Sequence, residues 1–445
     1  MSAEDVFRAI ESTPIYLWAL LFFAFYPVVS SIMWTSTASA YWLRREFRRR
    51  VEPLPMGTPP RVSVIVPTYC EELHIEETLE ACLALDYPDF EVVVVDDGST
   101  DGTVDRVMRY VRERGVRLIA KRQNEGKAMA LNDAVHCVSG EIVFIIDADA
   151  APEPDCLRYL APHFASPRVA AVTANPRVVE RETLLEKMQT MEFTSIVSIL
   201  RRAQRVWGRV LTVSGVSTAF RRAALYDVGL FSPDMATEDI DLTWKLQKRY
   251  YDVRYEPGAV VWMRVPRTAR ALWHQRRRWA RGLIEVLRRH GPSVIGSWKR
   301  RRMWPVMIEA ILSIMWAYCF VGLTAIWIAS YAVGHPPVGA SPIPNWWGMV
   351  IATLSVVQLT VGALLDARYE RGVLRSLPVA VLYPLVYWMF MALVTVVSVP
   401  MGLRRRRESR TVSRWRTPRQ GQALETPVIS TVPVGEPQLA LEPTP

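Results

Sequence analysis

Charged residues are distributed very unevenly along this chain of 445 residues. Four stretches contain no Asp, Glu, Lys or Arg, namely residues 12–43, 310–333, 345–365 and 376–403. Each stretch is long enough to cross a bilayer as a helix, which takes about 20 apolar residues. The sequence therefore predicts a multi-pass membrane protein with one large polar domain inserted between its transmembrane helices.

The four stretches define a domain plan. The first begins too far from the N-terminus, and is too long, for a cleaved signal peptide, so we expect residues 12–43 to form a retained transmembrane helix. Residues 303–403 are expected to hold three more such helices, and residues 60–290 to form the polar domain. Residues 417–445 are rich in Pro, Thr, Gly and Gln, and this composition predicts a disordered tail.

The formal charge of +10 raises the possibility of a nucleic-acid partner. The basic residues, however, gather beside the apolar stretches, as in Arg44, Arg45 and residues 299–302. Basic flanks stay in the cytosol, so we predict an inner (plasma) membrane protein with a cytoplasmic polar domain and no nucleic-acid partner. The count of spans leaves residues 404–407 outside, against the same rule, unless the last stretch does not fully cross.

The polar domain alternates short apolar runs with helical patterns. Residues 62–66, 92–95 and 142–146 are rich in β-branched residues, and residues 73–85, 102–114 and 127–138 have helical spacing. Strands that alternate with helices predict an α/β fold with a mainly parallel sheet. Ligands of such sheets bind at the carboxyl ends of the strands, and each of these three strands runs into a polar motif at that end.

The first two strand ends carry acids. Glu71 follows the first strand, and Asp97 belongs to the motif that ends the second strand, where carboxylates could accept hydrogen bonds from a base or a ribose. Polar turns remain an alternative, because Asp, Gly and Ser are turn formers. A calcium-binding EF-hand is excluded, because Met108 stands where its bidentate glutamate should be.

The next two motifs suggest phosphate and metal binding. Lys127 follows a glycine and opens a helical pattern, although Ala128 replaces the Ser or Thr of a true P-loop. Asp147 and Asp149 end the third strand, where two carboxylates can share a hard cation such as Mg²⁺ with substrate phosphates. A surface lysine and a chance pair of aspartates are the alternatives. The five cysteines show no zinc or disulfide spacing.

Two further motifs lie nearer the membrane stretches. Glu238 and Asp239 precede a helical run, where a carboxylate could remove a proton from an attacking hydroxyl; helix capping by Thr237 is the alternative. The segment Gln275-Arg276-Arg277-Arg278-Trp279 offers arginine forks for a diphosphate and a flat ring for a sugar. An amphipathic interfacial helix near residues 268–290 is an alternative for this last motif, and both readings can hold together.

In this order, the five motifs resemble glycosyltransferase family 2, and the Gln-x-x-Arg-Trp element of residues 275–279 resembles its processive membrane branch. The amino-acid sequence around the motifs is most similar to that of poly-β-1,6-N-acetyl-D-glucosamine synthases, for example in Thr212-Val213-Ser214-Gly215 and Tyr255-Glu256-Pro257. The resemblance covers about residues 60–290 and the flanking spans. It implies a GT-A-like nucleotide-sugar domain and an inverting, processive hexosyltransferase that makes an exopolysaccharide.

The resemblance also implies roles for individual residues. Asp239 would be the catalytic base with Glu238 beside it, and Asp149 with Asp147 would hold Mg²⁺ or Mn²⁺. The UDP-sugar would be bound by Pro67, Tyr69, Glu71, Asp97, Lys127 and Asp147. The acceptor and the diphosphate would be bound by Ser214, Gly215, Gln275, Arg278 and Trp279.

Several alternatives stay open. The enzyme could transfer a single sugar to a polyprenyl phosphate, or make a cellulose-, hyaluronan- or chitin-type polymer from another sugar. A membrane channel or scaffold that only binds nucleotide is a different class, which the full set of acids argues against. The partners implied by the resemblance are a UDP-sugar, the growing polysaccharide and the lipid bilayer. Control by cyclic-di-GMP, through arginines at the membrane face or a small membrane partner subunit, is a further expectation.

Overall fold

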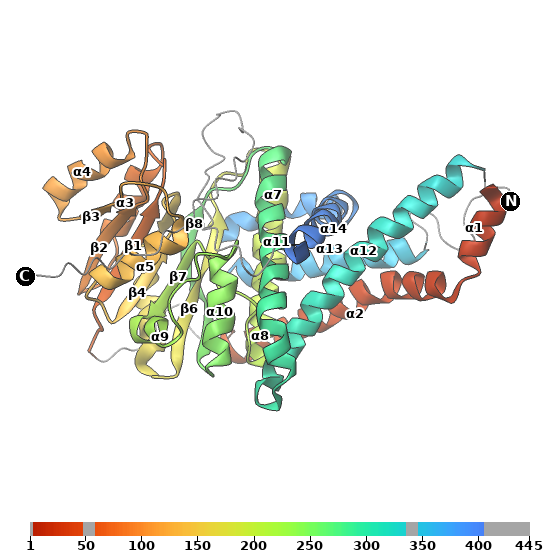
Figure 1. Cartoon of the computed structure of the whole chain (residues 1–445), viewed down its shortest axis with the longest axis horizontal. Helices are drawn as coiled ribbons and strands as arrows, with labels where there is room; N and C mark the ends of the chain where they lie inside the picture. Colours follow the sequence, from red (N-terminus) through yellow and green to blue (C-terminus); the bar gives the residue numbers. More distant parts are fainter. Residues whose placement is uncertain (1–2, 48–57, 335–345, 405–445) are drawn as a thin grey trace, which may run out of the picture.

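The structure, a computed structural model, describes residues 3–47, 58–334 and 346–404. Figure 1 shows an α/β part on one side and a group of long helices that reaches away from it on the other. The predicted disordered tail of residues 417–445 lies outside the described residues.

The α/β part is built on one sheet of eight strands in the order β3-β2-β1-β4-β7-β6-β8-β5. Strands β3, β2, β1 and β4 are parallel, whereas β7 runs antiparallel to both β4 and β6. The GT-A-like, mainly parallel sheet is thus confirmed, with a mixed second half. The strands are β1 Val62–Thr68, β2 Phe90–Asp96, β3 Arg117–Ala120, β4 Ile142–Ile146, β5 Ala150–Pro152, β6 Val169–Val178, β7 Ser217–Arg221 and β8 Asp252–Met263.

Helices cover both faces of the sheet. Strand β1 is buried along its length and places Val64 in one apolar cluster and Ile65 in the other, because successive side chains of a strand point to opposite faces. The first cluster includes α3 and α4, and the second includes α5 and α10. The helices of this part are α3 Ile75–Leu83, α4 Thr103–Arg114, α5 Lys127–Cys137, α6 Cys156–Leu160, α7 Leu184–Met191, α8 Ser198–Trp207, α9 Arg222–Asp227, α10 Glu238–Lys248 and α11 Ala269–Ile295.

The three helices predicted at residues 73–85, 102–114 and 127–138 are therefore confirmed as α3, α4 and α5, with their ends shifted by up to two residues. Helix α5 begins after Gly126, whose φ of +91° suits glycine better than a residue with a Cβ. The helix thus starts directly at Lys127.

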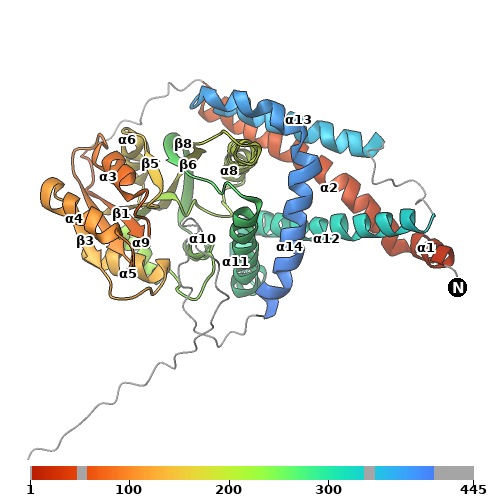
Figure 2. The same ribbon diagram turned by 90° about the horizontal axis from the view of Figure 1, so that it is seen from above.

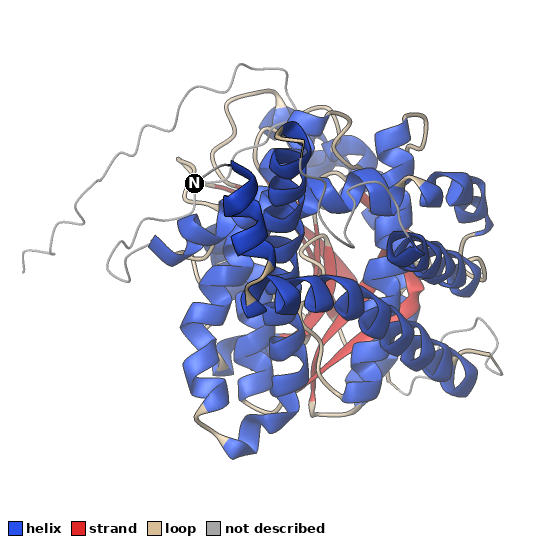
Figure 3. Cartoon of the chain, turned by 90° about the vertical axis from the view of Figure 1, so that its right-hand side faces the viewer, coloured by secondary structure: helices blue, strands red, loops and turns tan. Residues whose placement is uncertain are grey.

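Three helices of the described chain are long and apolar enough to cross a membrane: Pro14–Arg45, Trp298–Ala332 and Gly348–Asp366. Figure 2 shows α2 and α13 running side by side, and the Ser31 hydroxyl of α2 donates to the Leu354 carbonyl of α13 at 3.4 Å. Figure 3 views the molecule from the right-hand side of Figure 1, and from there the long helices lie in front of the sheet. The helices of this part are α1 Ala3–Glu11, α2 Pro14–Arg45, α12 Trp304–Ala332, α13 Trp346–Asp366 and α14 Trp388–Arg404.

The predicted fourth span is not one continuous α-helix. Residues 371–381 form a 3-10 helix, Tyr383–Tyr387 form a π-helix, and α14 itself has 17 residues. Prolines at 378 and 384 lack the backbone N–H that a regular helix needs, which explains the break. Whether this segment crosses the membrane stays a prediction.

Buried ion pairs join the helical part to the α/β part. Arg202 of α8 contacts Glu46, after α2, at 2.8 Å and Asp366, at the end of α13, at 2.7 Å. Arg177 of β6 contacts the same Asp366 at 2.9 Å. We call Glu46, Arg177, Arg202 and Asp366 the junction cluster. Because it ties the ends of two apolar helices to the sheet domain, it fixes how the two parts meet.

Candidate active site

The loops after β1 and β2 are bonded to each other. The Asp97 N–H donates to the Thr68 carbonyl at 2.9 Å, and the Glu71 N–H donates to the Thr103 hydroxyl at 2.9 Å. Pro67 is the next-to-last residue of β1, and Tyr69 follows that strand directly. The structure thus brings Pro67, Tyr69, Glu71 and Asp97 to one edge of the sheet, as parallel strands require.

Asp97 shapes the loop that leads to Lys127. Its fully buried carboxylate accepts hydrogen bonds from the N–H groups of Glu125 at 3.0 Å and Gly126 at 2.7 Å. Burial raises the pKa of Asp97, and these N–H groups together with Lys121 act in the opposite direction. Asp97 therefore holds the start of α5 in place, a role that the sequence did not reveal, while its contact with a substrate stays a prediction.

Lys127 is the centre of the site. Its ammonium group lies 2.5 Å from Asp147 Oδ1, 3.1 Å from the Gly215 carbonyl and 3.8 Å from Glu238 Oε1. Burial acts to lower the pKa of Lys127, but the charges of Asp147 and Glu238 raise it overall. We call Lys127, Asp147, Gly215, Glu238 and Asp239 the Lys127 cluster, which collects polar groups from four separate segments of the chain.

Asp239 completes this cluster. A Cβ placed on Gly215 would lie 3.0 Å from Asp239 Oδ2, so the glycine allows the carboxylate its close approach. Burial and the charge of Glu238 raise the pKa of Asp239 to about 6, while the Ile240 N–H, Lys127 and Arg278 act to lower it. A carboxylate with this pKa can accept a proton near neutral pH.

The capping role considered for Thr237 does not hold. The residue stands at the N-cap position of α10, but its side chain makes no capping hydrogen bond. Instead it packs against α11, where a Cβ on Gly282 would lie 2.2 Å from the Thr237 hydroxyl oxygen. Close packing of the two helices, and not a cap, therefore positions the acids of α10.

The two aspartates after β4 have different surroundings. The Ala150 N–H donates a hydrogen bond to the Asp147 carbonyl and closes a turn that contains both aspartates. Asp147 turns to Lys127, whereas Asp149 is buried and lines a small cavity together with His74, Glu77 and Arg264. Within the described chain, no group of three or more His, Cys, Asp or Glu side chains could hold a metal by itself.

The acceptor residues predicted from the sequence lie on two segments. Ser214 precedes Gly215, and its N–H donates to Thr173 of β6 at 2.9 Å. Gln275, Arg278 and Trp279 lie on α11, at a spacing that puts them on one side of the helix. Of these three, Arg278 acts electrostatically on Asp239. No hydrogen bond or ion pair of the described residues links Gln275 or Trp279 to the Lys127 cluster.

Arg276 belongs to the motif of residues 275–279 but was given no role of its own there, and in the structure it organises this helix. It is buried, contacts Glu192 at 2.5 Å, and lies 4.1 Å from the centre of the Trp279 ring. Tyr387 donates to the same Glu192 carboxylate at 2.7 Å. Arg276 therefore holds the Trp279 ring in a fixed orientation. Glu192 lies 84 residues from Arg276 and 195 residues from Tyr387 in the sequence, so no local pattern pairs these residues.

Arg201 of α8 is a residue that no motif revealed. It is buried, its guanidinium lies 5.7 Å from the centre of the Tyr255 ring, and burial lowers its pKa. It also interacts electrostatically with Asp239. The site therefore contains a buried positive charge besides Lys127.

The amino-acid sequence is also similar to those of known enzymes. The sequence model described as "Glycosyltransferase like family 2" matches residues 59–282. The chain belongs to glycosyltransferase family 2. It is 34% identical over 409 residues to the poly-beta-1,6-N-acetyl-D-glucosamine synthase of Staphylococcus epidermidis, covering 90% of this chain and 98% of that protein. The enzyme of the same name from Staphylococcus aureus (strain COL) is 34% identical over 407 residues, again covering 90% of this chain and 98% of that protein.

The fold of this family 2 hexosyltransferase is also found in a solved structure. A mannosyltransferase of Pyrobaculum calidifontis, in complex with GDP-Man and Mn²⁺, matches with a TM-score of 0.59 and 28% identity. The match covers 86% of this chain and 98% of the mannosyltransferase. It confirms the GT-A-like fold and shows a divalent metal in a relative of this enzyme.

Proposed function

We propose that this enzyme is a membrane-embedded, inverting and processive glycosyltransferase that polymerises UDP-N-acetylglucosamine to poly-β-1,6-N-acetylglucosamine. The observation that carries the proposal is the Lys127 cluster, in which a partly buried base with a pKa of about 6 lies beside groups suited to a diphosphate. The similarity to two staphylococcal synthases over nearly the whole chain supports the choice of sugar and product.

In the proposed reaction Asp239 takes the proton of the acceptor hydroxyl. The hydroxyl oxygen bonds to the anomeric carbon, and the bond from that carbon to the UDP oxygen breaks. Attack from the face opposite to UDP inverts the anomeric centre. Lys127 and Arg278 offset negative charge on the departing diphosphate, and Gln275 and Trp279 hold the terminal sugar of the acceptor. The uridine end of the donor lies by Pro67, Tyr69, Glu71 and Asp97.

The residues present suit a divalent cation. The ammonium group of Lys127 already lies 2.5 Å from Asp147, just after β4, and 3.8 Å from Glu238, at the start of α10. Carboxylate oxygens are the ligands that Mg²⁺ and Mn²⁺ accept, with substrate phosphates completing the shell. Asp149 and Asp147 would hold the ion, which would supply positive charge to the leaving diphosphate. Calorimetric titration of the enzyme with UDP, with and without Mn²⁺, tests this metal site without measuring turnover. The Asp149→Asn variant is expected to lose the metal-dependent part of UDP binding.

The domain plan and the location follow from the apolar helices. We infer that residues 12–43 and the three apolar stretches of residues 303–403 cross the plasma membrane and that the domain of residues 60–290 is cytoplasmic. A polymer could then leave through the helices beside Trp279. Cysteine labelling of both membrane faces tests the plan, including the position of residues 404–407.

Product analysis tests the main proposal. Membranes that contain the enzyme are incubated with UDP-N-acetylglucosamine and, separately, with UDP-glucose and GDP-mannose, each with Mg²⁺ or Mn²⁺. The expected result is a polymer from UDP-N-acetylglucosamine that a β-1,6-specific hydrolase degrades. A lipid-extractable monosaccharide as the only product would instead indicate transfer to a polyprenyl phosphate. The same assay with and without cyclic-di-GMP, and with candidate small membrane subunits, tests those two expected partners.

A further inference from the structure

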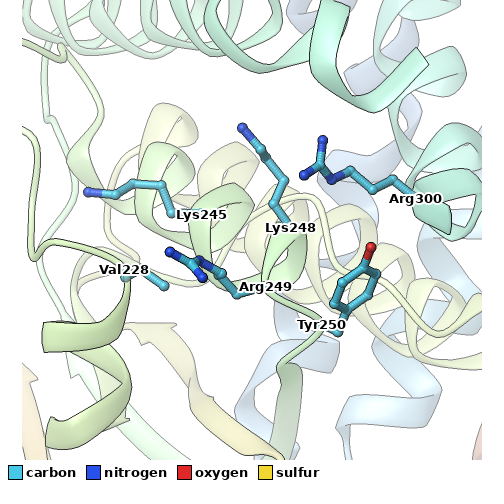
Figure 4. A pocket seen from close by; sticks show the side chains of 6 residues that line it. All are labelled: Val228, Lys245, Lys248, Arg249, Tyr250 and Arg300. Atoms are coloured by element: carbon cyan, nitrogen blue, oxygen red, sulfur yellow. The ribbon is translucent and has the colours of Figure 1, made fainter. Parts of the chain in front are cut away.

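A cavity of about 490 Å³ lies at the C-terminal end of α10, away from the Lys127 cluster. Figure 4 shows the side chains around it, which come from the end of α9, from α10 with its following loop, and from the 3-10 helix Trp298–Met303 before α12. The lining residues are Val228, Lys245, Lys248, Arg249, Tyr250 and Arg300. None of them belongs to the proposed catalytic machinery.

Four of these six side chains are cations, and within the described chain none of the four forms an ion pair with a carboxylate. Lys245 donates to the Leu230 carbonyl at 2.5 Å, Lys248 contacts His290 Nδ1 at 3.1 Å, and Arg300 donates to the Ser293 carbonyl at 2.8 Å. None of these three partners is a carboxylate, so positive charge is concentrated at the cavity.

The nearest acids are already bonded elsewhere. Asp241 accepts hydrogen bonds from the Ser232 hydroxyl at 2.6 Å and from His290 Nε2 at 2.8 Å, and Asp234 pairs with Arg289. The junction cluster differs, because each of its arginines contacts a carboxylate. Asp241 and Asp234 act electrostatically on Lys245, and Asp241 also acts on Lys248, but four cations around one cavity still favour an anionic ligand.

Arg300 adds an unused donor. Its Nε is buried and has no hydrogen-bond partner among the residues that the structure describes. Burial and the charge of Arg300 lower the pKa of Lys248. An anion in the cavity would offset the repulsion between Lys248 and Arg300.

The position of the cavity points to the membrane surface. Arg300 lies in the 3-10 helix Trp298–Met303, which leads directly into the apolar helix α12. Trp298, at the start of the 3-10 helix, is 68% exposed, and tryptophan is enriched at the level of lipid headgroups. Basic flanks alone would explain Lys299, Arg301 and Arg302, but Lys245, Lys248 and Arg249 are far from the flank in sequence and complete the cavity from α10.

We propose that this cavity is a binding site for a phosphate group, carried by an anionic lipid headgroup or by a soluble phosphorylated molecule. Arginine forks and lysine ammonium groups match phosphate oxygens, and the volume lies in the range of ordinary ligand pockets, about 300–1,000 Å³. The site lies at the opposite end of α10 from Asp239 and is separate from the donor-sugar site.

Isothermal titration of the full chain in a neutral detergent tests the site. Short-chain phosphatidylglycerol below its micelle concentration and glycerol phosphate are titrated separately, with UDP present to fill the proposed catalytic site. The double variant Arg249→Gln/Arg300→Gln should bind phosphate roughly tenfold or more weakly than the wild type, since charge-assisted hydrogen bonds are lost. Arg301→Gln/Arg302→Gln removes the same charge beside the cavity and should bind like the wild type.

The single variant Arg249→Glu tests the site by a substitution that should not disturb folding, because the exposed Arg249 side chain makes no hydrogen bond or ion pair in the described chain. It should weaken phosphate binding as well. Binding of phosphatidylglycerol alone would identify a lipid as the source, and equal binding of glycerol phosphate would identify a soluble ligand. The proposal is wrong if the wild type binds neither probe, or if the cavity variants and the flank control bind equally.

Discussion

The Lys127 cluster and the junction cluster both bury charged groups, but their charge balance differs. In the junction cluster two arginines meet two carboxylates, Asp366 and Glu46, at 2.7–2.9 Å. In the Lys127 cluster one lysine faces three carboxylates, Asp147, Glu238 and Asp239. Balanced pairs favour a fixed structure, whereas surplus negative charge raises a pKa and leaves a group able to accept a proton. The difference supports the proposal that the junction cluster holds the molecule together and that the Lys127 cluster performs the chemistry.

The largest effect is expected from Asp239→Asn. The amide keeps the shape of the side chain but cannot take a proton, so turnover should fall by about 10²–10⁴. UDP binding by calorimetry should stay within about twofold, because no role in binding UDP is assigned to Asp239. The matched control is Asp234→Asn, a surface acid five residues earlier that pairs with Arg289. Undiminished turnover of UDP-sugar by Asp239→Asn would contradict the assignment of the base.

The next largest effect is expected at the junction cluster. Asp366→Asn leaves Arg177 and Arg202 buried with less counter-charge, and breaking a buried pair costs about 3–5 kcal/mol of folding free energy. A lower denaturant midpoint, followed by tryptophan fluorescence in detergent, is the measurement. Glu370→Gln removes a less buried pair, with Arg181, and should have a smaller effect. Equal midpoints for the two variants would show that the junction cluster does not stabilise the molecule as inferred.

The sequence predicted the Lys127 cluster better than the junction cluster, for a physical reason. Strands β1, β2 and β4 are continuous apolar runs, and their carboxyl ends must meet at one edge of a parallel sheet, so the acids that follow them converge. No such rule pairs Arg202 with Glu46, which lies 156 residues away. The contact of Lys127 with Asp147, and the buried Arg201 and Arg276, depend equally on tertiary packing that no local pattern encodes.

A smaller effect is expected from Gly215→Ala. The new Cβ would lie 3.0 Å from Asp239 Oδ2, so the carboxylate must move by a few tenths of an ångström. Misplacement of a reacting group by about 1 Å can lower a rate about 100-fold, so this shift should lower turnover about tenfold. Gly291→Ala, on α11, meets no atom within 4 Å and should leave turnover unchanged. Similar turnover of both variants would mean that the approach of Gly215 to Asp239 is not needed for catalysis.

The smallest effect, a shift of a pH profile, follows from the surplus charge of the Lys127 cluster. Asp239 is deprotonated, and able to act as a base, above its pKa of about 6, so turnover of the wild type should fall as the pH drops through that value. Glu238 contributes to raising this pKa, so Glu238→Gln should move the acidic limb of the profile to lower pH. Glu285→Gln, a buried acid of α11 that pairs with Arg281, is the control and should leave the limb in place. If the acidic limb stays at the same pH in Glu238→Gln, a group other than Asp239 sets the limb. The contrast in charge balance between the two clusters would then have no bearing on catalysis.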